Sequence, residues 1–406
     1  MNLAELSQLD GPSSELLYNF GLQPVSNRFL SGNCQNSAPT FSLELRINRD
    51  SGLIHLGKAF PVDELKPRYS WLTCFEPEDH LDAMVKTIIN LPGVDKDSVF
   101  GAYSFKDDST LQRLDYLGYT KQWRIDPEQD LGISDPCANV ETYQAVFTPT
   151  VAQQICQNHG AADVIIVRHV VEHANNLSGF LESIRALIKP NGYIVWELPD
   201  CERALEVGDC TTVWEEHVFY FTTFTFKLLL ESAGFSIVHY ESVPYPLENS
   251  IVAIVQEGKG QNNPNFSDSR IVQEEIDRAY RFVDTIKFRR HAIRNKLENF
   301  RENVGRIALF GAGHLSVAFL STLGLCDLID FVVDDNPNKK GTRMPVGNLA
   351  IKGSEALYSE KVRLCLLGIN PRNQSKVIAK HSLFEEQGGQ FASIFPGSEV
   401  YLEHIS

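Results

Sequence analysis

Between residues 86 and 257 the chain alternates short, strongly apolar runs with segments of helical periodicity. Residues 163–167 (Asp-Val-Ile-Ile-Val) have the composition of a strand buried on both faces, and residues 193–198 (Tyr-Ile-Val-Trp-Glu-Leu) form a second such run. Between them, residues 177–188 predict a helix that ends before Lys189-Pro190-Asn191-Gly192. Strands that alternate with helices in this way favour a doubly wound α/β sheet.

A similar pattern begins again near residue 304. An apolar run at 306–310 leads into Gly311-Ala312-Gly313, and further strands are expected at 328–334 and 362–367. Residues 258–303 lie before this second pattern and are expected to form a polar linker followed by a long, charged helix. The chain therefore holds two α/β units, or one unit and a smaller copy.

The first 85 residues have a different pattern, in which apolar and polar residues alternate over 41–47 and again over 51–56. This period of two predicts short, half-buried strands. The expected organisation is an N-terminal β-rich lobe (1–85), an α/β domain (86–257), a linker with a long helix (258–303) and a C-terminal Rossmann-like domain (304–406).

Charge and cysteine content exclude several classes of protein. The chain has 37 Lys and Arg against 52 Asp and Glu, a net charge of −15, so nucleic acids and anionic membranes would repel it. The sequence has no apolar run of membrane-spanning length and no leader-like N-terminus, and its eight cysteines form no CxxC pair. We therefore expect a cytoplasmic protein that binds neither nucleic acid nor membrane and has no disulfide framework.

Two histidines follow the two central strands of the predicted middle sheet. His173 comes after the run at 163–167, and His217 comes after the run at 193–198. Both segments should project from the carboxyl edge of the sheet, where ligands bind in open α/β folds. Histidine can take a carbon-bound proton that an adjacent ketone makes acidic, and the neighbouring Glu216 could orient the ring. The alternative is a structural role for both histidines, hydrogen-bonded within the core.

The turn at Gly311-Ala312-Gly313 follows a strand and opens a helix, which is the context of a dinucleotide-binding fingerprint. Ser316 stands where the third glycine would be, and Asp334 or Asp335 stands where an acid would bind a ribose. This turn predicts either a nicotinamide cofactor site or a tight turn that serves packing or part of a substrate.

Several segments, spread over nearly the whole chain, resemble the sugar C-methyltransferases that act on deoxy-sugar nucleotides. The family patterns LGxQPxxNxF, CxxCGLxQL, YxY, xNxLxH, YxEH, GGSLRV and DxNPxKxGxxxPG have counterparts at residues 20–29, 48–56, 69–71, 168–173, 214–217, 249–252 and 334–347. The resemblance implies a Rossmann-like class I methyltransferase domain flanked by the N-terminal lobe and the C-terminal Rossmann-like domain.

The resemblance also implies a reaction and a set of site residues. The methyl donor would be S-adenosylmethionine (SAM), and the substrate would be a nucleotide-linked keto-deoxysugar whose nucleotide the C-terminal domain covers. His217 would abstract the proton at C3, Glu216 would hold this base in place, and Tyr69 and His173 would stabilise the enolate. The implied donor-binding residues are Gly101, Tyr103, Ser104, Asp107, Asp126 and Arg168. The implied substrate-binding residues are Arg28, Asn249, Gly311 and Gly313.

The chain departs from the family pattern at three places. Asn48 and Ser51 replace two zinc-ligand cysteines, so we expect no zinc. The turn after the first strand of the middle domain holds one glycine, and Tyr103 has a side chain where a bound donor would approach the backbone. Trp214 replaces a tyrosine. Two alternatives to methyl transfer follow: a relative that only binds a sugar nucleotide or a partner, and an NAD-dependent sugar-modifying enzyme.

Overall fold

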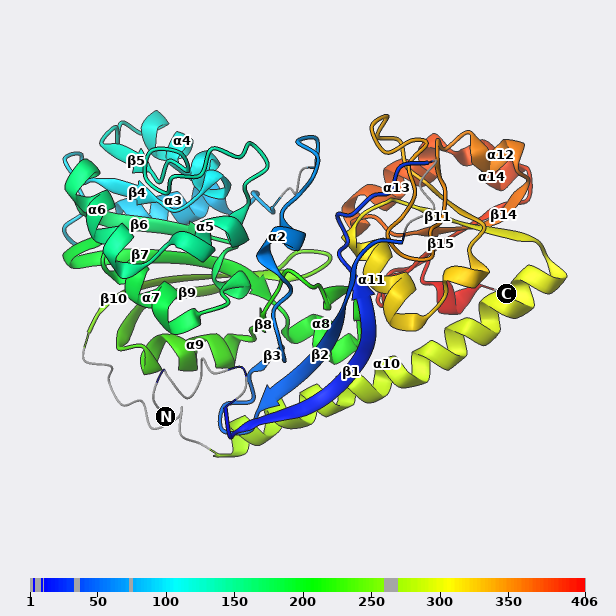
Figure 1. Ribbon diagram of the computed structural model, residues 1–406, viewed down its shortest axis with the longest axis horizontal. Coiled ribbons are helices and arrows are strands. Elements are labelled where there is room, and N and C mark those ends of the chain that lie inside the picture. Colours follow the sequence, from blue (N-terminus) through cyan, green and yellow to red (C-terminus); the bar gives the residue numbers. More distant parts are fainter. Residues whose placement is uncertain are drawn as a thin grey trace. The chain divides into compact units, whose positions relative to one another are not determined.

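The computed structural model describes residues 3, 9, 11–32, 37–72, 76–258 and 269–405 (Figure 1). Nearly all of the predicted linker at 258–268 lies outside the described residues, as do Cys34 and Cys74. The chain forms two compact units, and each unit is assembled from separate parts of the sequence. Unit 1 comprises residues 1–15, 46–202 and 216–276, and unit 2 comprises 16–45, 203–215 and 277–406.

Unit 1 contains a six-stranded sheet with the order β5-β4-β6-β7-β10-β9 (Figure 1). Its strands are β4 (Phe100–Ala102), β5 (Gln122–Arg124), β6 (Ala162–Arg168), β7 (Ile188–Asp200), β9 (Phe235–Val243) and β10 (Asn249–Glu257). The first four strands in this order are parallel, whereas β10 runs antiparallel to both β7 and β9. The predicted Rossmann-like α/β class is confirmed.

Helices cover both faces of this sheet, as the unbroken apolar run of β6 predicts. Val164 and Ile166 pack with one group of helices, and Ile165 and Val167 pack with the other. The first group is α3 (Leu81–Ile89) and α4 (Asp108–Tyr116). The second is α5 (Val140–Val146), α6 (Pro149–His159), α7 (Leu177–Arg185) and α9 (Thr223–Ser232). Successive side chains of a strand point to opposite faces, so β6 is apolar throughout because both of its faces are covered.

The boundary between α7 and β7 differs from the prediction. The helix ends at Arg185, and the strand begins at Ile188 and continues through Pro190 and Asn191. Ile188 pairs with Ala162 of β6, and the register then shifts before Val164 pairs with Tyr193. An irregularity in the ladder therefore accommodates Pro190, whose missing N–H would interrupt a regular strand.

A second sheet has the order β1-β2-β3-β8. Its strands are β1 (Ser14–Pro24), β2 (Thr40–Asn48), β3 (Ile54–Leu56) and β8 (Phe219–Tyr220). The predicted strands at 41–47 and 51–56 thus correspond to β2 and β3. The β8 strand comes from much later in the chain and pairs antiparallel with β3, so it ties the segment after His217 to the N-terminal part of the sequence.

Unit 2 contains a parallel five-stranded sheet with the order β13-β12-β11-β14-β15. The strands are β11 (Arg306–Phe310), β12 (Phe331–Val333), β13 (Ile351–Lys352), β14 (Val362–Leu367) and β15 (Gln390–Ser393). Its helices are α11 (His314–Leu323), α12 (Ala356–Ser359), α13 (Pro371–Lys380) and α14 (Ser382–Glu386). The β12 strand is shorter than the predicted strand at 328–334, and residue 328 instead ends the 3₁₀ turn Cys326–Leu328.

The 35-residue helix α10 (Ser269–Asn303) matches the predicted long, charged helix. Two short helices complete the fold, α2 (Val62–Leu65) and α8 (Glu202–Val207). Among the described residues, none of the helices combines the length and apolar character that crossing a membrane requires.

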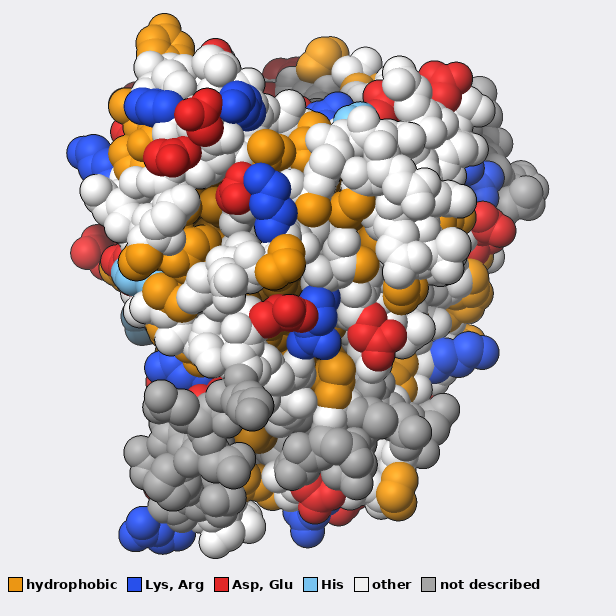
Figure 2. All heavy atoms as spheres, turned by 90° about the vertical axis from the view of Figure 1, so that its left-hand side faces the viewer, with side chains coloured by type: hydrophobic (Ala, Val, Ile, Leu, Met, Phe, Trp, Pro, Cys, Tyr) orange, Lys and Arg blue, Asp and Glu red, His pale blue; other side chains and the backbone are white. Residues whose placement is uncertain are grey.

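Charged side chains of both signs are interspersed on the face of the molecule in Figure 2. At the surface of unit 1, ion pairs join Arg113 to Asp82 at 2.8 Å and Lys121 to Asp97 at 2.7 Å. Exposed pairs of this kind contribute only about 0–1 kcal/mol each to the free energy of unfolding. The stability of unit 1 therefore comes mainly from its two apolar layers.

Candidate active site

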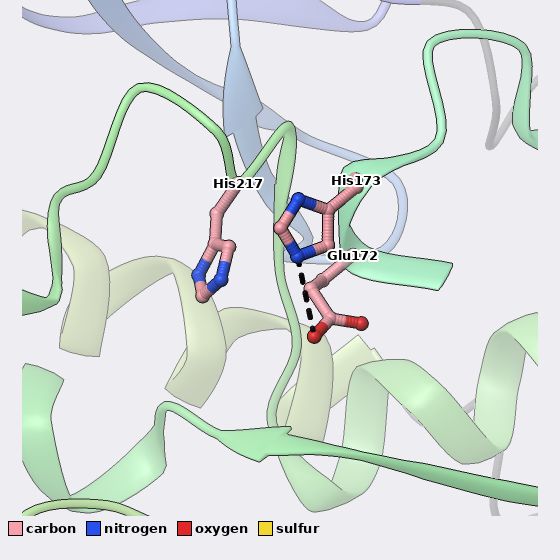
Figure 3. Close-up of side chains that lie close together, drawn as sticks. All are labelled: Glu172, His173 and His217. Atoms are coloured by element: carbon pink, nitrogen blue, oxygen red, sulfur yellow. Dashed lines mark ion pairs between the residues drawn. The ribbon is translucent and has the colours of Figure 1, made fainter. Parts of the chain in front are cut away.

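His173 and His217 lie side by side in unit 1, with ring centroids 4.8 Å apart and ring planes at 86° (Figure 3). His173 ends the short 3₁₀ helix Val171–His173 that follows β6. The backbone of Val218 brings His217 to this point, because its N–H donates to the carbonyl of Glu172 at 2.8 Å and its carbonyl accepts from the N–H of Leu56 at 2.8 Å. The predicted convergence of the two histidines is therefore present in the structure.

Glu141 orients the His173 ring, a role that the sequence did not predict. Its Oε1 lies 2.6 Å from His173 Nδ1, and each side chain is 2% exposed. A carboxylate at this distance accepts a hydrogen bond from Nδ1 and fixes the orientation of the ring. Glu141 is held in helix α5, whose first turn Asn139 caps by accepting from the N–H of Thr142. Glu141 and His173 thus form the carboxylate–histidine pair that many acid–base sites contain.

Glu216 joins this group, whereas Tyr69 does not. Potential ligand atoms of Glu141, His173 and Glu216 all lie within 4.8 Å of one another. Tyr69 stacks on Trp71 with ring centroids 4.9 Å apart, and none of the contacts found among the described residues joins it to the histidines. Of the four residues implied as catalytic, the structure brings together His173, Glu216 and His217.

A second overlapping group consists of Glu172, His173 and His217, whose potential ligand atoms also lie within 4.8 Å of one another. Imidazole nitrogens and a carboxylate are ligand types that a divalent transition metal accepts. Both groups have the composition of a metal site, which the sequence patterns do not predict.

The turn after β4 leaves no space for a methyl donor that would bind against the backbone of a glycine. A Cβ placed on Gly101 would lie 2.7 Å from atoms of both Ile165 and Trp123, so the protein's own side chains fill this space. Tyr103 is 0% exposed and packs edge-on against Phe147 and Phe180, with ring centroids 5.2 and 5.4 Å away. This glycine permits internal packing and leaves no room for a ligand beside it.

The polar residues of the same turn also bond internally. Ser104 and Asp107 form a reciprocal cap, and Asp107 Oδ1 accepts from the N–H of Arg168 at 2.9 Å. Burial raises the pKa of Asp107 to about 7, although the hydrogen bond from Ser104 and the charge of Arg168 oppose this rise. Asp126 Oδ1 accepts from the N–H groups of Glu128 and Gln129 at 2.9 and 2.8 Å, so this oxygen caps a local turn.

Arg168 belongs to a buried ionic network under the sheet edge. Its guanidinium pairs with Glu197, and Glu197 also lies 3.0 Å from His169 Nε2 and 3.2 Å from His80 Nε2. Burial alone would raise the pKa of Glu197, but hydrogen bonds from the two histidines and the charges of His169 and Arg168 hold it well below its ordinary value. Arg168 therefore serves this network in the structure, with 0% of its surface exposed.

Glu76 connects this network to solvent and gives a pH-dependent prediction. Its carboxylate lies 2.7 Å from Lys106 Nζ and 3.5 Å from His169 Nδ1. Burial would raise its pKa, but the charges of His169 and Lys106 lower the value from 4.5 to about 2. A carboxyl group whose pKa is lowered by folding stabilises the folded state at pH values above its ordinary pKa. This stabilisation is lost as the pH falls toward the pKa of the folded state.

We expect the wild-type free energy of unfolding to fall by about 3 kcal/mol more between pH 5 and pH 2 than that of Glu76→Gln, because each pKa unit is worth about 1.4 kcal/mol. Urea unfolding at a series of pH values measures the difference. Parallel pH profiles for the two proteins would contradict the prediction.

The residues implied for substrate binding are divided between the two units. Asn249 begins β10 of unit 1, whereas Arg28, Gly311 and Gly313 belong to unit 2. A Cβ on Gly311, which has φ +103°, would lie 2.5 Å from the Ile369 side chain. This glycine is required by backbone conformation and close packing.

Unit 2 brings two of the segments that carry the family resemblance, residues 20–29 and 214–217, together with the start of α11. Trp214 stacks on His314 at the start of α11, with ring centroids 4.4 Å apart, and its indole N–H donates to Ser26 Oγ at 3.1 Å. Ser26 also donates its backbone N–H to the Glu215 carboxylate at 2.5 Å. Trp214, which replaces the family's tyrosine, therefore has both a stacking and a hydrogen-bonding partner.

The two positions that replace zinc ligands form hydrogen bonds of a turn. Asn48 Oδ1 accepts from the N–H groups of Asp50 and Ser51, at 3.0 and 3.2 Å, and Ser51 Oγ accepts from the N–H of Leu53 at 3.2 Å. Both residues are buried, at 2% and 0% exposure. Side-chain oxygens thus stabilise this turn through hydrogen bonds.

Comparison with known proteins matches a methyltransferase domain at residues 106–240 and a C-methyltransferase C-terminal domain at residues 267–396. The C-methyltransferase NovU of Streptomyces niveus is 23% identical over 392 residues, which cover 94% of this chain and 93% of NovU. Among solved structures, a SAM-dependent methyltransferase from Aquifex aeolicus aligns with 45% of this chain and 94% of its own at 14% identity and a TM-score of 0.30. A 1,6-didemethyltoxoflavin-N1-methyltransferase from Burkholderia thailandensis aligns with 44% of this chain and 77% of its own, at 13% identity and a TM-score of 0.29.

The Rossmann-like sheet and the matched domain define the class of protein, which is a methyltransferase. Within this class, the C-terminal domain match and the nearly full-length alignment with NovU confirm the resemblance to the sugar C-methyltransferases. The two domain matches and the alignment with NovU support C-methyl transfer as the general activity of this chain.

Proposed function

We propose that this C-methyltransferase acts on a nucleotide-linked keto-deoxysugar and forms an enolate before the methyl group is transferred. The observation that carries the proposal is the pair of adjacent imidazoles, 4.8 Å apart, with Glu141 2.6 Å from Nδ1 of one of them. Carbon–carbon bond formation requires a carbanion equivalent, and a pair of histidines with a carboxylate partner supplies the acid and base that form one.

The two histidines have different surroundings, and this difference suggests their roles. His217 takes the proton from the carbon next to the ketone, with Glu216 beside it. His173 donates to the developing enolate oxygen, and the contact between Glu141 and Nδ1 holds its ring in place for this role. SAM supplies the electrophilic methyl group when it is bound, and the turn at 101–109 does not hold it as a glycine-rich turn would.

Proton exchange and calorimetry test the proposal on the wild-type protein. In D₂O with a nucleotide-linked 4-keto-deoxysugar, we expect deuterium to enter at C3 faster than in buffer alone, as observed by proton NMR. Calorimetric titration should detect binding of SAM and no binding of NADH. Exchange at the buffer rate would contradict the enolate mechanism, and binding of NADH alone would favour the redox alternative.

A second candidate function is a relative that binds a sugar nucleotide without transferring a methyl group. The observation that favours it is the closed turn, in which Tyr103 is fully buried and the space beside Gly101 is filled. Calorimetry separates this candidate from the first, because a binding relative takes up the sugar nucleotide but neither SAM nor NADH.

A further inference from the structure

Glu172 lies close to His173 and His217 and takes no part in the proposed acid–base steps. Its side chain is 3% exposed, and Oε1 lies 3.8 Å from His173 Nε2 (Figure 3). The same oxygen lies 3.8 Å from His169 Nδ1. Among the described residues, no hydrogen-bond donor reaches either of its carboxylate oxygens. A buried carboxylate without hydrogen bonds destabilises the folded state, so its position between two imidazoles points to a functional use.

His169 is held toward Glu172 by a rare backbone conformation. Its φ is +51°, which is uncommon for a residue with a side chain. The conformation is maintained because the backbone N–H donates to the Glu197 carbonyl at 2.6 Å and the ring Nε2 lies 3.0 Å from the Glu197 carboxylate. As a result, Nδ1 faces both Glu172 and Glu76, at 3.8 and 3.5 Å. Unusual backbone geometry of this kind occurs preferentially at functional sites.

The charge state of His169 suits proton transfer. Burial lowers its pKa, but the carboxylates of Glu76, Glu197 and Glu172 outweigh burial and raise the pKa above its ordinary value. The surrounding carboxylates therefore favour the protonated form of the ring. Because Nδ1 faces both Glu76 and Glu172, this nitrogen can release a proton to one carboxylate and afterwards take one up from the other.

Four ionisable side chains thus form a line from the interior toward solvent. They are His173, Glu172, His169 and Glu76, whose side-chain exposures are 2%, 3%, 5% and 18%. The gaps between them are 3.8, 3.8 and 3.5 Å, and each gap exceeds a hydrogen bond by less than 1 Å. Proton transfer along the line requires side-chain movements of this size.

We propose that Glu172 is a proton relay between the histidine pair and the His169–Glu76 pair. The inference rests on the proposed function, in which a proton leaves a carbon atom of the substrate. The C–H bond breaks, its electron pair stays in the enolate, and the proton passes from the His217 imidazolium to the Glu172 carboxylate, because ligand atoms of these two residues lie within 4.8 Å of each other. His169 first gives its Nδ1 proton to Glu76, which releases it to water, and the vacated Nδ1 then accepts the proton from Glu172. No oxidant or reductant takes part.

The test compares two rates in Glu172→Gln, a variant of the same shape that cannot carry the proton. The first rate is deuterium entry at C3 of the 4-keto-deoxysugar nucleotide in D₂O, and the second is methyl transfer in a single turnover with SAM. Exchange requires the abstracted proton to leave the site, whereas transfer consumes the enolate while that proton remains. We expect the ratio of exchange to transfer to fall about tenfold or more, an effect within the range of a single proton-transfer group.

Two further variants sharpen the result. Glu172→Asp keeps a carboxylate and should restore much of the exchange, and Glu182→Gln, at an exposed position of α7, should leave the ratio at the wild-type value. An unchanged ratio in Glu172→Gln, whether both rates fall together or neither falls, would overturn the relay. A wild-type protein that catalyses neither exchange nor transfer would instead overturn the proposed function, and the relay with it.

Discussion

Replacing His217 with alanine is expected to lower the rate of deuterium exchange at the substrate carbon by about 10²- to 10⁴-fold, the usual contribution of a general base. The structure leaves little to take over the role, because His173 Nδ1 is engaged by Glu141 at 2.6 Å. Proton NMR in D₂O with the keto-sugar nucleotide measures the loss directly. Binding of the nucleotide sugar should change far less than the exchange rate, because the base acts on the reacting carbon.

The matched control for this prediction is His239→Ala. His239 lies on β9 of the same unit, and its side chain is 33% exposed beside Glu241. This variant should retain wild-type exchange, which separates the loss of a specific base from a general effect of removing an imidazole. Exchange at the wild-type rate in His217→Ala would remove His217 from the role of base, and the histidine pair would then be structural.

Replacing Glu197 with alanine is expected to lower the free energy of unfolding by about 3–5 kcal/mol. Glu197 is fully buried and is shared by Arg168, His169 and His80. Its removal leaves the Arg168 guanidinium buried without its carboxylate, and this desolvated charge accounts for most of the loss. Urea unfolding followed by tryptophan fluorescence measures it, because the neighbouring Trp196 is also completely buried.

An exposed arginine–carboxylate pair provides the comparison. Asp82 pairs with Arg113 at 2.8 Å, but its side chain is 79% exposed. Asp82→Ala should therefore change the free energy of unfolding by no more than about 1 kcal/mol. Similar losses of unfolding free energy in Glu197→Ala and Asp82→Ala would contradict the prediction, because they would show that solvent reaches the Arg168–Glu197 pair.

Sequence patterns predicted the centre of unit 1 well because the relevant signal is local. The apolar runs that became β6 and β7 are long and unbroken, and both form central strands of the sheet. The predicted ends of helices and strands were less accurate where pairing with a distant strand determines them. The α7 helix ends early because Ile188 pairs with Ala162, and this contact leaves no mark on the local pattern.

The candidate site shows the same limit. His173 and His217 could be placed at one sheet edge because each follows a recognisable strand. Glu141 could not be predicted as their partner, since it lies 32 residues from His173 on a separate helix, and no spacing rule connects the two. The sequence also showed no sign that Arg168 belongs to a buried ionic network, because its main partner, Glu197, is 29 residues away on the neighbouring strand.

The long helix α10 has a consequence for how the protein can be divided. Its first residues belong to unit 1, where Glu275 is 5% exposed and accepts a hydrogen bond from Thr222 Oγ at 3.1 Å. A polypeptide that stops at residue 257 contains every strand of the six-stranded sheet but lacks this carboxylate. During synthesis, unit 1 therefore cannot be completed until residues beyond the sheet have left the ribosome, and a proteolytic cut before Ser269 would separate the unit from its last piece.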